Sequence, residues 1–178
     1  GERSVYPKSS IYPPGTTSEE EKKQSTADMV KSQDKAITAA INYLQSHPEI
    51  MATSKSKGLE RASQLDGEKI SFKVGETGGP SGGLIFSIGL VELLTEKDLL
   101  THRHIAGTGT INVRGVVGPI GGINEKIASA RKVGATLFFA PVENAEEIAN
   151  IPDGIKVVTV ATLAQAISYL ERTATKAG

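Results

Sequence analysis

Apolar residues recur at helical spacing in a long stretch near the start of the chain, and this spacing predicts a helix after an extended, proline-rich arm. The helix should begin at Ser18, because Ser18 and Glu21 form an S-x-x-E capping box, and it should run to about Gln45. His47 and Pro48 should then end it, since proline disfavours helical backbone in the residue before it. The apolar stripe expected on this helix consists of Met29, Val30, Ile37, Ile41 and Leu44.

The middle of the chain changes from strand-like to helical periodicity around a glycine-rich segment. Ile70, Phe72 and Val74 alternate with other residues and predict a half-buried strand that leads into this segment. The sequence LIFSIGLVELL that follows is too apolar for a surface helix, so we expect a buried, central helix there. Residues 104–118 are rich in β-branched residues and glycine, which is typical of short strands joined by tight turns.

The last third of the chain alternates helices with strands. The segment NEKIASARKVG predicts a helix with Ile123, Ile127 and Ala130 on one face and Gly134 as its C-terminal cap. TLFFAP and KVVTV predict strands, NAEEIANI predicts a short helix between them, and TLAQAISYLERT predicts a final amphipathic helix. Interleaved helices and strands of this kind indicate the α/β class, as a mixed α+β architecture in which short mixed sheets pack against helices.

The composition is that of one soluble domain, and it argues against several functions. The chain has 178 residues, of which 38% are hydrophobic and 22% charged, which suits a single domain with a core of its own. Twenty basic residues balance twenty acidic ones, so no overall field attracts nucleic acid or an anionic membrane. Four Phe, four Tyr and no Trp argue against a base-stacking platform. The absence of cysteine excludes disulfides and thiolate chemistry.

The glycine-rich segment GETGGPSGGL, residues 75–84, places Ser81 among glycines and Pro80. Three interpretations compete: a flexible loop, a phosphate-binding loop, and a backbone kept free of side chains so that a substrate can approach Ser81. A phosphate-binding P-loop requires G-x-x-x-x-G-K-[ST], and no lysine follows these glycines. The segment does match the G-x-S-x-G pattern of nucleophilic serines, between Gly79 and Gly83.

A nucleophilic serine needs a general base, and the histidines are poor candidates for that role. Of the three histidines, His47 adjoins a proline, and His102 and His104 form an H-x-H pair without the further ligands of a metal site. A neutral lysine can replace histidine, provided that burial lowers its ordinary pKa of ~10.4 by ~2 to 3. Lys126 is the candidate, because it lies among apolar residues after a glycine-rich stretch. A solvated surface charge is the other interpretation of Lys126, and the residues by themselves leave both open.

Residues 69–170 resemble the proteolytic domain of Lon-type proteases. Three motifs carry the resemblance, in the family's order and at its intervals: G-P-S-x-G at 79–83, T-G-x-I-x-x-R-G at 108–115 and P-I-G-G-x-x-E-K at 119–126. Lon-type proteases are serine peptidases that use a Ser-Lys dyad.

By this resemblance, Ser81 is the nucleophile, Lys126 is the general base and Thr108 contacts the lysine amine. The helix that follows Ser81 should direct its free N–H groups at the oxyanion, with the backbone of Gly79, Ser81 and Gly82 as the candidate donors. The family usually has alanine at the position of Gly82, and glycine there should leave substrate access open while loosening the start of the helix. The ATP-dependent members also have an acidic residue just before G-P-S, where this chain has Gly78. Neither departure touches the dyad.

The N-terminal part resembles a narrower group, the bacterial PDZ-containing Lon-like peptidases, through D-M-x-x-S-Q-x-x-A at residues 28–36. Those proteins are membrane-anchored with the peptidase outside the cytoplasm, which is the location that the resemblance implies here; a cytoplasmic location is the alternative. Their PDZ module precedes the catalytic strand, where this chain has only a short segment. We therefore expect an N-terminal arm and helix at 1–50, a linker or loop at 51–68 and the peptidase domain at 69–178. A naturally short form and the removal of a module both remain open.

The resemblance implies an ATP-independent serine endopeptidase that cleaves peptides or unfolded proteins through an acyl-enzyme, without a metal or other cofactor. Because the sequence holds no P-loop, any ATP-driven unfolding would come from a separate protein. Nucleic acid is not expected as a partner, a membrane is expected only through an anchor outside this sequence, and homo-oligomerisation is left open. The alternative is a catalytically idle Lon-like domain that serves as a protein-interaction or assembly module.

Overall fold

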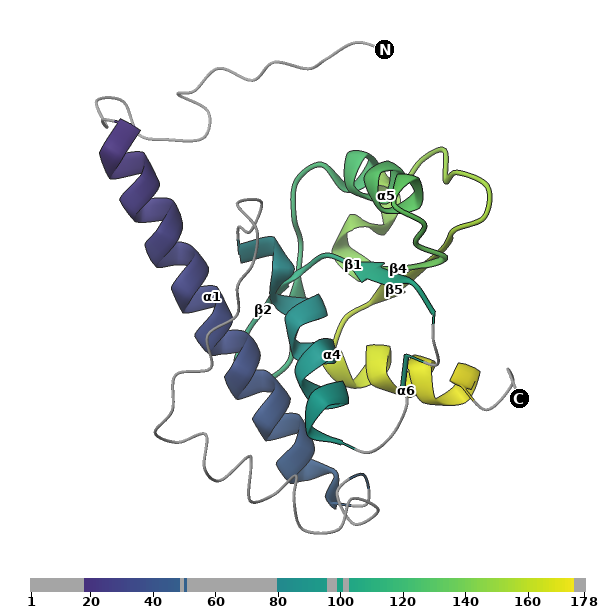
Figure 1. The fold of residues 1–178 in the computed structure, drawn as a ribbon, viewed down its shortest axis with the longest axis horizontal. Helices are drawn as coiled ribbons and strands as arrows, with labels where there is room; N and C mark the ends of the chain where they lie inside the picture. The colour runs from purple at the N-terminus through teal and green to yellow at the C-terminus, as the bar shows by residue number, and fades with distance from the viewer. Residues whose placement is uncertain (1–17, 49, 51–79, 96–98, 101–102, 175–178) are drawn as a thin grey trace.

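The computed structural model describes residues 18–48, 50, 80–95, 99–100 and 103–174 (Figure 1). Its elements, in chain order, are α1 (Ser18–Ser46), η2 (Pro80–Gly82), α4 (Gly83–Leu94), β1 (Ile105–Gly107), β2 (Thr110–Ile111), β3 (Val117–Gly118), α5 (Ile123–Lys132), β4 (Leu137–Pro141), η3 (Val142–Glu147), β5 (Lys156–Val160) and α6 (Leu163–Ala174). Small sheets packed against helices confirm the predicted α/β class. The strand predicted from Ile70 to Val74 and the linker predicted at 51–68 lie outside the described residues, so the division into three segments stays a prediction.

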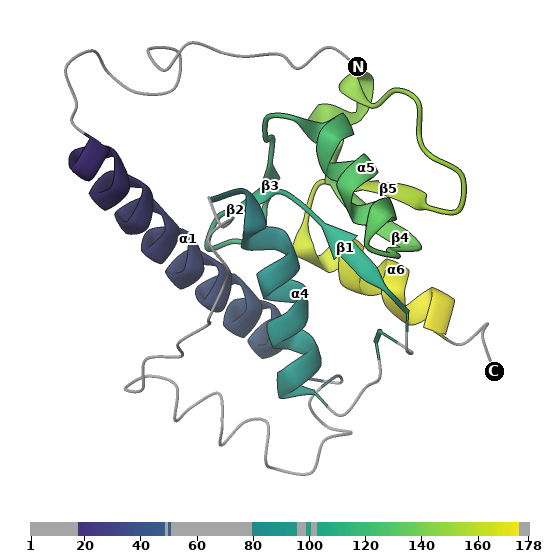
Figure 2. The same cartoon turned by 45° about the horizontal axis from the view of Figure 1, so that its top comes forward.

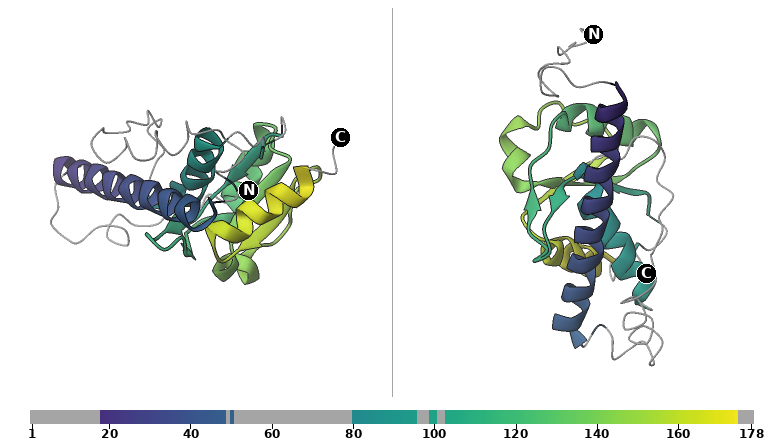
Figure 3. Two further views of the ribbon diagram at one scale, coloured as in Figure 1. Left: turned by 90° about the horizontal axis from the view of Figure 1, so that it is seen from below. Right: turned by 90° about the vertical axis from the view of Figure 1, so that its left-hand side faces the viewer.

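Helix α1 begins and ends close to where the sequence predicts, and its buried face agrees with the predicted stripe in part: Leu44 is buried and Ile37 packs against the core. The predicted stripe included Val30, whose side chain is 50% exposed. The buried residues of the helix that pack in the core are Ala36, Ala39, Ala40, Tyr43 and Leu44. Alanines allow α1 and α4 to approach closely, because the distance between packed helices depends on side-chain size at the contact. The N-terminal end of α1 extends beyond the other described elements (Figure 3).

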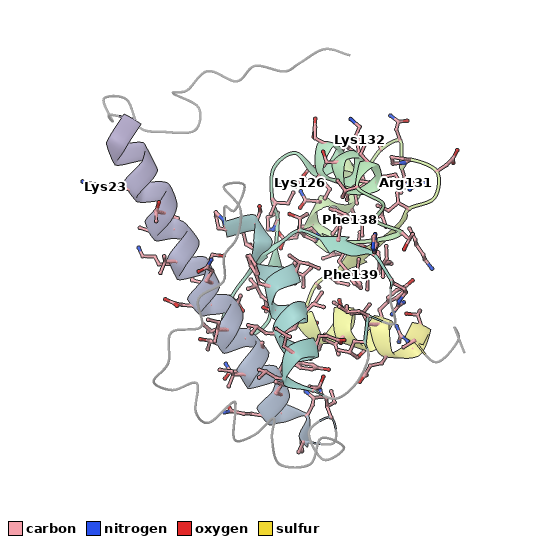
Figure 4. The ribbon with its side chains drawn as sticks, viewed as in Figure 1. Lys23, Lys126, Arg131, Lys132, Phe138 and Phe139 are labelled. Atoms are coloured by element: carbon pink, nitrogen blue, oxygen red, sulfur yellow. The ribbon has the colours of Figure 1, made fainter. Side chains whose placement is uncertain are left out.

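A three-stranded parallel sheet in the order β1-β4-β5 divides the interior in two. All five residues of β4 are buried, as expected for the central strand of a parallel sheet. Phe138 packs with α5 on one face of the sheet, whereas Phe139 packs with α4 and α6 on the other (Figures 2 and 4). Successive residues of a strand point to opposite faces, so the run LFFAP supplies both cores.

A second, two-stranded sheet pairs β2 with β3 in antiparallel register, Thr110 opposite Gly118 and Ile111 opposite Val117. The turn between the strands is closed by Asn112, whose Oδ1 accepts hydrogen bonds from the N–H groups of Arg114 at 2.9 Å and Val116 at 3.1 Å. The prediction of short strands with tight turns in this region is confirmed.

The predicted central helix is α4, which lies between α1 and the parallel sheet (Figure 2). Its buried side chains include Leu84, Ile88, Leu90 and Val91. The predicted helix after β4 is corrected in type and position: it is the 3-10 helix η3, which begins at Val142, two residues earlier than the pattern indicated. Within the described ranges, no helix combines the length and the apolar character needed to cross a membrane.

Candidate active site

Ser81 lies in the 3-10 turn η2 immediately before α4, and its backbone is fixed by the loop that joins β1 to β2. The carbonyl of Ser81 accepts hydrogen bonds from the N–H of Gly109 at 2.7 Å and from Thr108 Oγ1 at 3.0 Å. The carbonyl of Gly109 in turn accepts the N–H of Leu84 at 3.1 Å. This close approach requires glycine at 109, where φ is +150° and a Cβ would come within 2.7 Å of the Val117 side chain.

Lys126 lies on helix α5 (Figure 4), which brings it to Ser81. The helix starts after Gly122, whose φ of 69° lies in the left-handed region. Ile123 and Ile127 are almost fully buried in the core that also contains Phe138, and this packing fixes which face of α5 is turned toward the sheet. Lys126, between those isoleucines, is half-buried, as is Ser81.

The Nζ of Lys126 donates a hydrogen bond to Ser81 Oγ at 3.5 Å, although 45 residues separate the two. This distance is at the long end for a hydrogen bond, and proton transfer requires about 2.6–3.2 Å. Hydrogen bonds between catalytic residues are often this long before substrate binds, so the distance is compatible with proton transfer in a substrate complex. The structure thus brings together the two residues that the sequence singled out.

Thr108 has a different hydrogen-bond partner from the one expected. The resemblance predicted a contact with the lysine amine, but the hydroxyl of Thr108, a residue that is 4% exposed, donates to the carbonyl of Ser81. The N–H of Thr108 donates to the carbonyl of Phe139 at 2.9 Å, which ties it to the end of β4. Thr108 therefore holds the backbone of Ser81 against the sheet, rather than orienting Lys126 directly.

Replacing Thr108 with valine is expected to lower kcat of peptide hydrolysis by about tenfold, the equivalent of about 1.4 kcal/mol. Valine keeps the shape but removes the donor, which leaves the Ser81 carbonyl with only the Gly109 N–H. Loss of the hydrogen bond should also lower the melting temperature by a few degrees, for a cost of about 1 kcal/mol. Thr38→Val is the matched control, because the Thr38 hydroxyl is exposed and bonds only within α1. Unchanged turnover in Thr108→Val would show that the hydroxyl does not hold the nucleophile.

Gly82 occupies the N-cap position of α4, with φ −88° and ψ −3°. A Cβ at this position would come within 2.9 Å of the Phe86 ring, so the alanine usual in the family would require that ring to move. This contact gives the departure at Gly82 a packing reason. Gly79, the other candidate oxyanion donor, lies outside the described residues, and the oxyanion role of both glycines stays a prediction.

Asn144 is a residue that the sequence reasoning missed. It is fully buried, its Oδ1 accepts the N–H of Ile120 at 3.0 Å, and its Nδ2 donates to the carbonyl of Ile120 and the carboxylate of Glu147, both at 2.9 Å. These bonds anchor the loop that leads into α5, and hence the position of Lys126. The only signal in the sequence was a polar residue shortly after the apolar strand TLFFAP.

Here a serine hydroxyl just before a buried helix faces the amine of a lysine on another helix. This arrangement is typical of serine hydrolases that use lysine in place of histidine. A family profile described as "Lon protease (S16) C-terminal proteolytic domain" matches residues 16–174. The chain belongs to this family, which confirms the resemblance seen in its motifs and the peptidase class that it implies. The matched range includes α1 as well as the elements that carry Ser81 and Lys126.

Curated relatives of this chain are themselves named Lon proteases. The chain is 41% identical over 78 residues to Lon protease of Azorhizobium caulinodans, which covers 44% of this chain and 9% of the relative. It is 38% identical over 78 residues to Lon protease 1 of Bacillus subtilis, covering 44% and 10% respectively. It is 34% identical over 95 residues to Lon protease of Rhizobium meliloti, covering 51% and 12%. The matched part is therefore about a tenth of each relative's length.

Proposed function

We propose that this chain is the catalytic domain of a serine endopeptidase that hydrolyses peptide bonds through an acyl-enzyme on Ser81. The observation that supports this proposal most directly is the 3.5 Å contact between Lys126 Nζ and Ser81 Oγ. Membership of the Lon proteolytic-domain family supports the same reaction class. The Ser-Lys pair needs no metal for this chemistry, because the lysine supplies the base and the serine supplies the nucleophile.

In the proposed reaction the neutral amine of Lys126 accepts the proton of the Ser81 hydroxyl while Oγ attacks the peptide carbonyl. The resulting ammonium donates that proton to the leaving amine as the C–N bond breaks, and the acyl group remains as an ester on Oγ. Lys126, neutral again, then accepts a proton from water as the water attacks the ester. Collapse of this second intermediate breaks the C–Oγ bond, the proton returns to Oγ, and the acid product leaves.

The oxyanion of each tetrahedral intermediate would lie near the start of α4. Helix N-termini present backbone N–H groups without intrahelical partners and the positive end of the helix dipole, both of which stabilise negative charge. We propose the N–H groups of Gly79 and Gly82 as donors, on the ground that they lie within two residues of Ser81 in the sequence and that Pro80, between Gly79 and Ser81, has no N–H. The hydrogen bonds to the Ser81 carbonyl support this arrangement, because they hold the turn that leads into the helix.

We further propose that the substrates are peptides or unfolded proteins and that the domain cleaves them without nucleotide, because none of the steps above uses ATP. The likeness of residues 28–36 to the PDZ-containing Lon-like peptidases supports a location outside the cytoplasm, on a membrane-anchored protein. Protease accessibility of the protein in intact and lysed cells distinguishes this location from a cytoplasmic one.

A covalent serine-directed probe tests the proposed function. The 178-residue chain is incubated with a fluorophosphonate, and the modified residue is located by mass spectrometry of its peptides. In parallel, hydrolysis of a fluorescently labelled unfolded protein is followed without ATP. We expect a single label on Ser81 and loss of hydrolysis in proportion to labelling. A chain that is neither labelled nor active would instead be the idle Lon-like domain, retained as an interaction or assembly module.

A further inference from the structure

Helix α1 contacts the residue that precedes the proposed nucleophile. Ser32, on α1, is 8% exposed, and its Oγ donates a hydrogen bond to the carbonyl of Pro80 at 3.2 Å. The two residues are 48 positions apart in the chain, so this bond joins α1 to the turn η2. The carbonyl of Pro80 belongs to the peptide group whose nitrogen is that of Ser81. The bond therefore fixes the orientation of the backbone on the N-terminal side of Ser81.

Ser81 is thus held on both sides. The peptide group after it is held by the N–H of Gly109 and the hydroxyl of Thr108, and the peptide group before it is held by Ser32. The direction of a serine Oγ depends on the orientation of its backbone and on its rotamer. A nucleophile must stay within about 0.5 Å and 10–20° of its productive position, so anchoring both peptide groups limits the two backbone angles that matter most.

We propose that Ser32 is a positioning residue for the nucleophile, and that α1 is part of the catalytic apparatus rather than only a support that packs on it. This inference rests on the proposed function, since it assigns to Ser32 the orientation of Ser81 for attack. It predicts that removal of the Ser32 hydroxyl slows the chemical step and leaves substrate binding unchanged.

Two other roles for Ser32 have to be separated from this one. The hydroxyl could simply help α1 pack on the domain, or it could contact substrate, because Ser32 lines a cavity of about 240 Å³ together with Pro80 and Thr110. Ser87 provides a matched control for the first role. It is fully buried in α4, and its Oγ can donate to the carbonyl of Ala36 on α1 or to the carbonyl of Gly83 within α4, both at 3.0 Å. It thus takes part in the same helix–helix contact as Ser32 but has no bond to η2.

The experiment compares the wild-type chain with Ser32→Ala and Ser87→Ala. For each protein we measure the second-order rate of inactivation by a small fluorophosphonate, kcat and KM for a peptide substrate, and the melting temperature. We expect Ser32→Ala to lower both the inactivation rate and kcat by about tenfold, with KM within about twofold of wild type. Ser87→Ala should lower the melting temperature at least as much as Ser32→Ala does, while its inactivation rate and kcat stay within about twofold of wild type.

A second pair of variants covers the case in which Ser32→Ala does not fold. Ser32→Thr and Ser32→Val add nearly the same volume, and only threonine keeps the hydroxyl, so the threonine variant should react about tenfold faster with the probe than the valine variant. The inference would be overturned if Ser32→Ala and Ser87→Ala lowered the probe inactivation rate and kcat equally. It would also be overturned if the threonine and valine variants reacted with the probe at equal rates. A raised KM with an unchanged rate of probe inactivation would overturn it too, because that result indicates substrate contact. A wild-type chain inert to both probe and peptide would overturn the proposed function, and the inference with it.

Discussion

Replacement of Lys126 by methionine is expected to abolish peptide hydrolysis, with kcat lowered on the order of 10³-fold or more. The substitution removes the amine that lies 3.5 Å from Ser81 Oγ, and with it the only described side chain that is hydrogen-bonded to that hydroxyl. Methionine keeps a similar length and suits the apolar surroundings of Ile123 and Ile127, so α5 should stay in place. Steady-state hydrolysis of a labelled unfolded protein and a thermal melt measure the two effects separately.

Two further variants test whether Lys126 acts as a general base or only supplies a positive charge. Lys126→Arg should be as inactive as Lys126→Met, because guanidinium stays protonated and cannot accept the serine proton. Lys132→Met makes the same chemical change at an exposed position of the same helix, and it should leave hydrolysis unaffected (Figure 4). Hydrolysis that survives in either Lys126 variant would mean that the general base lies elsewhere.

Replacement of Ser81 by alanine should remove both hydrolysis and probe labelling, with turnover lowered on the order of 10⁴-fold or more. No acyl-enzyme can form without the hydroxyl. The fold should persist, with a melting temperature within about 2 °C of wild type, because the bonds that fix this turn use the carbonyls of Pro80 and Ser81 rather than the Ser81 side chain.

The matched control for this variant is Ser129→Ala, which removes an exposed serine hydroxyl from α5 and should preserve activity. Turnover retained in Ser81→Ala, with the probe attached to another residue, would contradict the assignment of the nucleophile. Loss of activity accompanied by a collapse of the melting temperature would show instead that the side chain serves the fold.

Periodicity predicted the elements well where one face of an element is strongly apolar. The bounds of α1, the buried helix α4 and the buried face of α5 followed from the spacing of large apolar residues and from capping residues. The buried face of α1 followed only in part: Leu44 is buried as predicted, but the buried Ala36, Ala39 and Ala40 were not in the predicted stripe. By the size of its apolar side chain, Val30 is a better candidate for burial than these alanines, whereas close packing of two helices favours small side chains.

The site was predictable as a set of residues but not as a set of contacts. The motifs singled out Ser81 and Lys126, and the structure places them in contact. The partner of the Thr108 hydroxyl could not be obtained from the sequence, because the path of the backbone decides that the carbonyl of Ser81 lies within its reach. For the same reason Asn144 gave little signal, since its partner Ile120 is distant in the chain. Ser32 belongs to the D-M-x-x-S-Q-x-x-A segment at 28–36, but its contact with Pro80, 48 residues away, could not be obtained from that segment.

The helices next to Ser81 and Lys126 pack on opposite faces of the parallel sheet. Ser81 lies in the turn that leads into α4, which packs in the core containing Phe139, whereas Lys126 lies on α5, which packs in the core containing Phe138. The distance between the Ser81 hydroxyl and the Lys126 amine therefore depends on the relative position of two helices that are packed in separate cores. A substitution deep in either core can lengthen that distance by a fraction of an ångström while the chain stays folded, because close-packed interiors transmit strain rather than absorb it. Peptidase activity should then respond to the alignment of the two helices, and loss of activity in such a variant need not involve any residue at the site.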